Sequence, residues 1–169
     1  MCQEVTSVQR CPCPFCAIVC GEDVAVREVA RNDKVVVFFP TEPAVLGHCM
    51  VIPRRHVEEF VALTSDEVSA VMTSAQAVAM SLRETYHPDG INIIQSNGEA
   101  ATQSVPHVHV HIVPRWDGDA FGEIWPSKTD FSDEEKDRAL AKLRATTLLP
   151  DSSVTPEDRR QHLSFAQNV

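Results

Sequence analysis

The chain has 169 residues, a natural length for one domain with a substantial core, and 43% of them are hydrophobic. Its formal net charge of −9 argues against broad contact with nucleic acid or an acidic membrane surface. No run of about 18 apolar residues predicts a membrane span, and the polar first ten residues lack the apolar centre of a secretion signal. We therefore expect a cytoplasmic protein whose six cysteines are thiols or metal ligands rather than disulfides.

Short strands dominate the predicted elements, after a loose polar arm over residues 1–10. Apolar and β-branched runs bounded by turn residues are typical of strands. We expect strands at residues 25–30, 34–39 and 48–53, another that begins over 91–94, and a last one over 105–114.

A long helix is predicted between the two groups of strands. Thr64 and Glu67 have the spacing of a capping box, which marks the start of a helix. Apolar residues then recur every three or four positions until Tyr86, after which proline and glycine cannot continue the helix.

A second capping box, Ser132 to Glu135, predicts a short helix that ends near Ala145. We place one domain over residues 11–146, followed by a polar tail over 147–169. Neighbouring strands combined with one long helix favour an α+β domain with an antiparallel sheet.

Three histidines stand at alternate positions of the last predicted strand. His107, His109 and His111 alternate with valines, and side chains two residues apart on a strand share one face. The imidazoles should therefore lie roughly 6–7 Å apart, with the valines in the core. Such a row can bind a metal, a phosphate or a reacting phosphorus.

Cys13 and Cys16 form a Cys-x-x-Cys pair, which is half of a tetrahedral zinc site. No second such pair exists, so histidines are the candidates for the missing ligands. Cys11 could replace Cys13, and the thiols could also be simply reduced or a redox pair. His48 and His56 flank a predicted strand, where a histidine is either functional or merely packed or solvated.

The polar loop over residues 96–104 precedes the histidines. Gly98 permits a tight turn, and the amide and hydroxyl side chains can donate to phosphate oxygens. Alone it is an ordinary hairpin loop, but beside three histidines it becomes a candidate anion cradle.

Taken together, these motifs resemble the histidine-triad superfamily of nucleotide hydrolases and transferases, over roughly residues 13–118. The His-x-His-x-His signature with two following apolar residues carries the resemblance. Four further segments agree with it: Cys13 to Cys16, Phe38, Gly47 to His56, and Asn97 to Val105. The resemblance implies an α+β fold with about five antiparallel strands and a two-fold homodimer that binds a small nucleotide. The helix from about Ser65 to Tyr86, with its small apolar residues Ala75, Val78 and Ala79, and the strand after it would lie near the dimer interface.

The resemblance also implies roles for individual residues. His109 would attack the α-phosphorus of a phosphoramidate, adenylate or dinucleotide-type substrate, and water would release the covalent nucleotidyl-histidine. His111 would bind phosphate or hold His109, with His48 behind it in a histidine relay. Gln103 and Ser104 would donate to the phosphate and leaving group. The nucleotide-binding set would be Phe38, Asn97, Gly98, Gln103, Ser104, His109 and His111.

In zinc-bearing relatives the metal ligands fall on positions that are Cys13, Cys16, His56 and His107 here. Four protein ligands leave no open position, so this zinc would be structural. The chain departs from the family pattern at Pro40, where a ribose acceptor is usual, and at Thr102, where glycine is frequent. A third departure is Ser96, where a ligand-binding amide is expected, although a one-residue shift would align Asn97 there.

Two other classes of function stay open. One is a nucleotide-binding or regulatory protein with incidental turnover, which Pro40 would permit. The other is a metalloenzyme with the three histidines around a catalytic metal. Steady-state turnover with a panel of nucleotide substrates distinguishes the first from an enzyme, and full activity in excess chelator would exclude the second.

Overall fold

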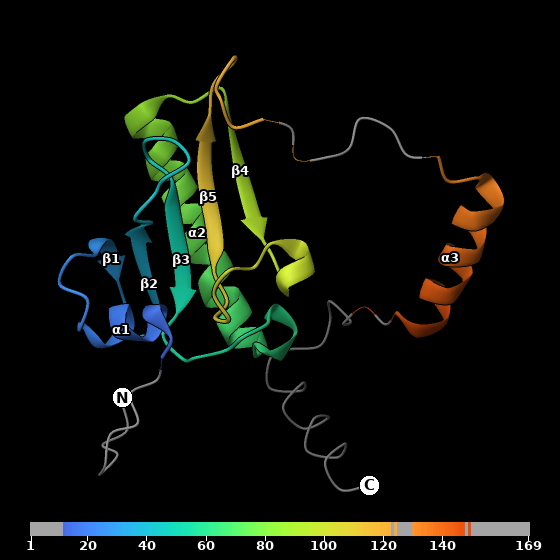
Figure 1. Ribbon diagram of the computed structural model, residues 1–169, viewed down its shortest axis with the longest axis horizontal. Helices are drawn as coiled ribbons and strands as arrows, with labels where there is room; N and C mark the ends of the chain where they lie inside the picture. The colour runs from blue at the N-terminus through green and yellow to red at the C-terminus, as the bar shows by residue number, and fades with distance from the viewer. Residues whose placement is uncertain (1–11, 123, 125–129, 148, 150–169) are drawn as a thin grey trace, which may run out of the picture. The chain divides into compact units, whose positions relative to one another are not determined.

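The computed structural model describes residues 12–122, 124, 130–147 and 149 (Figure 1). It divides into two compact units, Met1–Gly122 and Glu123–Val169. The predicted arm lies outside the described residues, as does the predicted tail apart from residues 147 and 149. The division after Gly122 falls inside the 11–146 domain expected from the sequence.

The first unit contains a five-stranded sheet, which confirms the α+β prediction. The strands are β1 (Arg27–Arg31), β2 (Val35–Phe39), β3 (Cys49–Pro53), β4 (Gly90–Gln95) and β5 (Val110–Arg115). Their order is β1-β2-β3-β5-β4, and every neighbouring pair is antiparallel. Strand β5, which carries His111, therefore lies between β3 and β4, in the interior of the sheet, although the long helix and β4 separate it from β3 in the chain.

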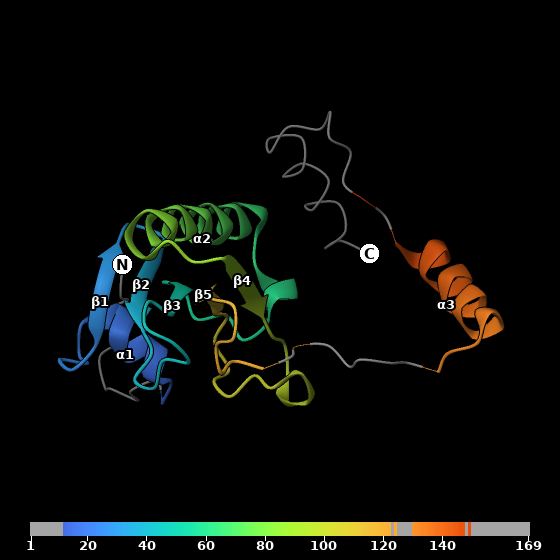
Figure 2. The ribbon, with the colours of Figure 1, turned by 90° about the horizontal axis from the view of Figure 1, so that it is seen from above.

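Helix α2 (Ser65–Tyr86) begins and ends where the sequence predicted. The Thr64 hydroxyl accepts from the Glu67 amide, and the Glu67 carboxylate accepts from the Thr64 amide, which completes the capping box. The helix lies along β2, β3 and β5 on one face of the sheet (Figure 2).

The apolar side of α2 is used within the chain. Ala75 is fully buried, and Val78 and Ala79 pack against the same core cluster as the strands. These are the small residues that the sequence placed near a dimer contact. A second chain in a dimer could therefore contact α2 only on the side that faces away from the sheet.

Helix α1 (Pro14–Cys20) was not expected from the sequence and lies on the opposite face of the sheet from α2 (Figure 2). Pro14 occupies the start of the helix, and Gly21 ends it in a left-handed conformation with φ +73°. The Arg31 guanidinium on β1 donates to the carbonyl oxygens of Ile18 and Val19 at the end of the helix. Two short 3-10 turns, η1 (Phe60–Ala62) and η2 (Glu99–Ala101), complete the first unit.

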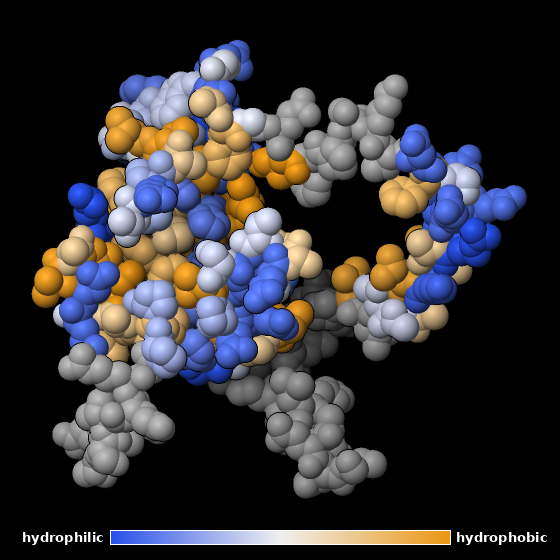
Figure 3. All heavy atoms as spheres, in the orientation of Figure 1, coloured by the Kyte–Doolittle hydropathy of each residue, from blue (hydrophilic) through white to orange (hydrophobic). Residues whose placement is uncertain are grey.

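Helix α3 (Asp133–Thr146) in the second unit also has its predicted capping box, between Ser132 and Glu135. It has no buried residue, and hydrophilic side chains cover much of its face in view in Figure 3. Among the described residues, no helix is long and apolar enough to cross a membrane.

Candidate functional site

The histidine segment departs from the predicted strand at its first half. Strand β5 starts at Val110 rather than near Val105, so only His111 of the three histidines lies on the strand. The chain bends before it, with the His107 amide donating to the Val105 carbonyl at 2.8 Å and the Val108 amide to the Val57 carbonyl at 2.6 Å. Contacts to Pro53 at the end of β3 and to Val57 after it hold His107 and Val108 in place of regular strand pairing.

His107 is fully buried and faces Cys13 and Cys16 at the start of α1. Its Nε2 donates to the Pro53 carbonyl oxygen at 2.9 Å, and a carbonyl can only accept. In the neutral ring the Nδ1 atom therefore keeps its lone pair, and it lies 3.5 Å from the Cys13 sulfur and 3.8 Å from the Cys16 sulfur. Burial is the main reason why the pKa of His107 is lowered.

Cys13, Cys16, His56 and His107 form one cluster whose ligand atoms all lie within 4.8 Å of one another. The His56 Nδ1 atom is 3.3 Å from the Cys16 sulfur. Zn–S and Zn–N bonds of 2.0–2.3 Å place tetrahedral ligand atoms about 3.4–3.8 Å apart, so these separations fit a zinc ion. A ligating imidazole that donates its other nitrogen to a carbonyl, as His107 does, is the usual arrangement at such sites. These four residues could hold a metal.

His109 is buried beside the cluster. Its Nδ1 donates to the His107 carbonyl oxygen at 2.8 Å, which leaves the Nε2 lone pair of the neutral ring unused by that bond. Phe15 of α1 packs edge-on against both His107 and His109, with ring centroids 5.9 and 5.3 Å away. Sequence reasoning did not select Phe15. Its place inside the Cys-x-x-Cys motif was the available signal, because a site that joins Cys13 and Cys16 to His107 must bring Phe15 there too.

His48 and His111 form a relay that fixes their ring protons. The Ala44 amide donates to His48 Nδ1 at 3.1 Å, so Nε2 carries the proton of the neutral His48 ring. That Nε2 donates to His111 Nδ1 at 2.9 Å, which leaves the His111 proton on its own Nε2. The His111 ring lies 4.9 Å from the His109 ring, so a donor nitrogen and a lone-pair nitrogen occur on neighbouring side chains.

Both histidines of the relay are neutral at neutral pH. Burial lowers the pKa of His48. Burial, with smaller contributions from His109 and His48, lowers the pKa of His111 to about 4. Neutral rings suit a site that must bind through one nitrogen and donate through the other.

The polar loop holds its own shape through Asn97, Gly98 and Gln103. The Gln103 Oε1 atom accepts from the Gly98 amide at 2.6 Å, and its Nε2 donates to the Glu58 and Val105 carbonyl oxygens. Asn97 Oδ1 accepts from the Phe60 amide at 2.7 Å. The phosphate contact predicted for Gln103 would require its side chain to leave these backbone partners.

The other predicted residues lie around this loop and α1. Ser104 is exposed directly before the histidine segment. Phe38 is 2% exposed, and its ring packs edge-on against the Phe15 ring with the centroids 5.6 Å apart. It therefore lies behind Phe15, which itself contacts the histidines. Thr102 has φ +68°, a left-handed conformation that favours glycine, which gives a physical meaning to the glycine usual there. Pro40 follows the end of β2 and is half-buried.

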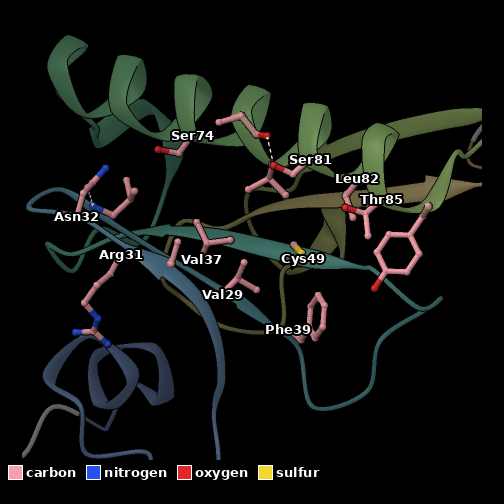
Figure 4. A pocket seen from close by; sticks show the side chains of 15 residues that line it. Val29, Arg31, Asn32, Val37, Phe39, Cys49, Ser74, Ser81, Leu82 and Thr85 are labelled. Atoms are coloured by element: carbon pink, nitrogen blue, oxygen red, sulfur yellow. Dashed lines mark hydrogen bonds between the residues drawn. The ribbon is translucent and has the colours of Figure 1, made fainter.

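A separate cavity of about 360 Å³ lies on the α2 face of the sheet (Figure 4). It opens between α2, which contributes Ser81 and Leu82, and the strands, which contribute Val29, Val37 and Phe39. None of the predicted catalytic or metal residues lines it. The predicted site residues gather instead on the α1 face and in the loops at the end of β3.

Comparison with known proteins identifies the family of the chain. The model of the HIT domain matches residues 24–118. The chain is 34% identical over 119 residues to a protein of Bacillus subtilis named protein hit, covering 70% of this chain and 81% of that one. It is 31% identical to the adenosine 5'-monophosphoramidase hnt1 of Schizosaccharomyces pombe, covering 68% of this chain and 84% of that one.

Solved structures share the fold. A HIT family member from Bacillus subtilis superposes with a TM-score of 0.73 at 29% identity, covering 82% of this chain and 99% of that one. A zinc-bound histidine triad family protein from Mycobacterium smegmatis gives a TM-score of 0.61 at 33% identity, covering 80% and 98%. A central antiparallel sheet with a histidine motif entering its inner strand defines this class of protein, and the chain belongs to the HIT family.

Proposed function

We propose that the protein is a hydrolase or transferase that acts on the α-phosphate of a nucleotide through a covalent bond to His109. The observation that carries the proposal is the hydrogen bond from His109 Nδ1 to the His107 carbonyl oxygen. It fixes the ring proton away from Nε2, and a neutral imidazole nitrogen with a free lone pair is a competent nucleophile. The lowered pKa values of His48 and His111 keep the surrounding rings neutral, so they do not add repelling positive charge around His109.

In the first step the His109 Nε2 atom forms a bond to the α-phosphorus while the bond to the leaving group breaks. The ring becomes a cation that retains its Nδ1 proton, and the His107 carbonyl oxygen stabilises it. The Nε2–H of His111 donates a hydrogen bond to a phosphate oxygen, and the Ser104 hydroxyl donates one to the leaving group. The leaving group takes its proton from a water molecule. In the second step water attacks phosphorus, the phosphorus–nitrogen bond breaks, and the proton of the water returns to solvent.

We propose a nucleoside 5'-phosphoramidate as the substrate. The name of the Schizosaccharomyces pombe relative supports this class, since that protein is called an adenosine monophosphoramidase. Breaking a phosphorus–nitrogen bond suits the site, because the amine needs only a proton to leave. Pro40 offers no acceptor to the ribose, so we expect weak discrimination at that group.

We also propose that Cys13, Cys16, His56 and His107 bind one structural zinc. The ligand separations, the proton position on His107 and the zinc-bound relative from Mycobacterium smegmatis support this assignment. Bound there, zinc would hold α1 against the histidine segment. We further propose a homodimer with the free edge of β4 near the interface, which a monomer mass in solution at micromolar concentration would contradict.

Rapid-quench intact-mass spectrometry with adenosine 5'-phosphoramidate tests the mechanism. We expect a transient adduct of one adenylyl group per chain, which peptide mapping locates on His109. The His111→Ala variant keeps the nucleophile and serves as the matched control, because it should still form the adduct, only more slowly. An adduct on another residue, or steady-state turnover with no adduct at any time, contradicts the proposal. Binding of nucleotide without turnover would favour the regulatory alternative.

A further inference from the structure

We propose that Gln103 is a positioning residue that ties the metal-ligand segment to the loop before the histidines, so that metal binding and the shape of this loop depend on each other. The inference rests on the proposed zinc site. It assigns to Gln103 a role different from the phosphate contact that the family resemblance suggested.

The segment over residues 53–60, which contains His56, is bound to the following part of the site at four points. Two of these contacts reach the histidine segment, where the Pro53 carbonyl accepts from His107 and the Val57 carbonyl accepts from Val108. The other two reach the polar loop. They are Gln103 Nε2 to the Glu58 carbonyl oxygen at 2.7 Å and the Phe60 amide to Asn97 Oδ1 at 2.7 Å.

The side chain of Gln103 bonds both to the polar loop and to the segment over residues 53–60. It is 9% exposed, and both of its N–H groups and its oxygen are used by backbone partners. A primary amide has two protons to donate, and here the Glu58 and Val105 carbonyl oxygens accept them. A side chain engaged in this way has no proton for a phosphate, and it joins the polar loop to Glu58, which lies 45 positions away in the sequence.

The segment that contains His56 is also bound to α2, through Arg55. Arg55 donates twice to the Glu67 carboxylate on α2, at 2.6 and 2.7 Å, and once to the Ala62 carbonyl oxygen. With α2 on one side and the polar loop on the other, His56 is presented to the cysteines from a segment held at both ends. If Gln103 is lost, one of these anchors is lost.

Two consequences follow from such a linkage. Loosening the polar loop should weaken the hold on the metal, and removing the metal should loosen the loop, because coupling between two sites is reciprocal. Partners that orient a ligand segment typically change metal affinity about 10-fold or more when they are removed. A Gln103 that serves only as a phosphate donor would change substrate turnover and leave metal binding untouched.

The test measures zinc transfer to a colorimetric chelator from the intact, zinc-loaded protein. We expect release about 10-fold faster from Gln103→Leu and from Gln103→Glu, which keeps an acceptor for the Gly98 amide but has no N–H for Glu58 and Val105. Asn97→Ala should accelerate release less, and Ser104→Ala, next to Gln103 but exposed, should release zinc at the wild-type rate. Hydrogen exchange over residues 97–108 should rise in wild-type protein when zinc is removed.

The outcomes separate this inference from the proposed function. Unchanged zinc release from both Gln103 variants, or unchanged exchange over residues 97–108 after zinc removal, overturns the linkage. Protein that binds no zinc overturns both the linkage and the metal site. Protein that binds zinc and shows the expected release rates but forms no adduct keeps the linkage and refutes only the covalent mechanism. If either Gln103 variant fails to fold, Asn97→Ala and the exchange measurement decide.

Discussion

Neighbouring residues of strand β5 serve opposite faces of the sheet. Val110 and Ile112 are fully buried in the cluster beneath α2. His111 lies between them in sequence and faces the other side of the sheet, the side that carries α1 and His109. On the α2 face, even the cavity of Figure 4 is lined mostly by apolar surface, with polar side chains such as Asn32, Ser74 and Ser81 among those that line it. The α1 face instead gathers imidazoles, thiols and backbone carbonyls. The alternation of one short strand thus assigns stability to one face and chemistry to the other.

His109→Ala should produce the largest effect on the α1 face. Turnover of adenosine 5'-phosphoramidate should fall by at least about 1,000-fold, because the covalent route is lost and only positioning by the remaining groups is left. Because His109 is buried and donates to the His107 carbonyl oxygen, its truncation should also lower the free energy of unfolding by about 1–3 kcal/mol, so turnover is measured where urea unfolding shows the variant to be folded. Binding of a nucleoside monophosphate, measured by calorimetry, should persist. Wild-type turnover in this variant would place the nucleophile elsewhere.

Ile112→Ala is the matching change on the α2 face of the same strand. Ile112 is fully buried, so its truncation should lower the free energy of unfolding by about 2–5 kcal/mol through lost apolar contact and the cavity left behind. Turnover per folded molecule, measured well below the unfolding midpoint, should stay within a few-fold of wild type. A variant that remained stable but lost turnover would show that the two faces are not separable.

The α2 face was the part of the fold that the sequence predicted best. Its signals are local: a capping box at Thr64, apolar residues at helical spacing, and alternating β-branched residues in the strands. Even there the small residues around Ala75 were linked to a partner chain, although they pack on the sheet. Sequence spacing shows which side of a helix is apolar and does not show what covers it.

The α1 face was predicted less well, because distant contacts shape it. Helix α1 is only seven residues long, and its Cys-Pro-Phe-Cys sequence was interpreted as a metal half-site, reduced thiols or a redox pair, not as the start of a helix. Pro14 at its start and Gly21 after its end were the local signals for a helix. The late start of β5 depends on the Val57 carbonyl, and the partners of Gln103 include Glu58, which lies 45 positions away. No pattern within the loop itself encodes those contacts.

The fold brings together the four residues that the sequence analysis proposed as zinc ligands, although they come from three separate segments. Residue spacing alone supplied only the two cysteines, and the family resemblance supplied the histidines.

Cys13→Ser should abolish stoichiometric zinc, measured by elemental analysis, and lower stability by about 2 kcal/mol in micromolar zinc. Cys20→Ser, at an exposed position outside the cluster, should retain one zinc per chain. Equal zinc in both variants would refute the site.

Lowering the pH should reduce the stability of the protein through His111 on the α1 face, by less than the substitutions above. Burial lowers the pKa of His111 to about 4 in the folded chain, whereas an unfolded histidine titrates near 6.5. Between these values the unfolded state binds a proton that the folded state does not, so stability is lost as the pH falls from about 6.5 to about 4. Because the ring is partly exposed, we expect a loss of about 1–2 kcal/mol rather than the full value of the shift.

The change that isolates this effect is His111→Asn, measured by urea unfolding at intervals between pH 7 and pH 4 in zinc-free buffer, so that protonation of the metal ligands does not contribute. The variant should lose less stability than the wild type over this range. Glu67 provides the contrast from the α2 face, because its hydrogen bonds to Arg55 lower its pKa to about 2. Its contribution is present above about pH 4.5 and is lost only as the pH falls toward 2, so Glu67→Gln should alter stability mainly in an almost pH-independent way above pH 5. Parallel pH profiles for wild type and His111→Asn would mean that the buried relay carries no titration of its own.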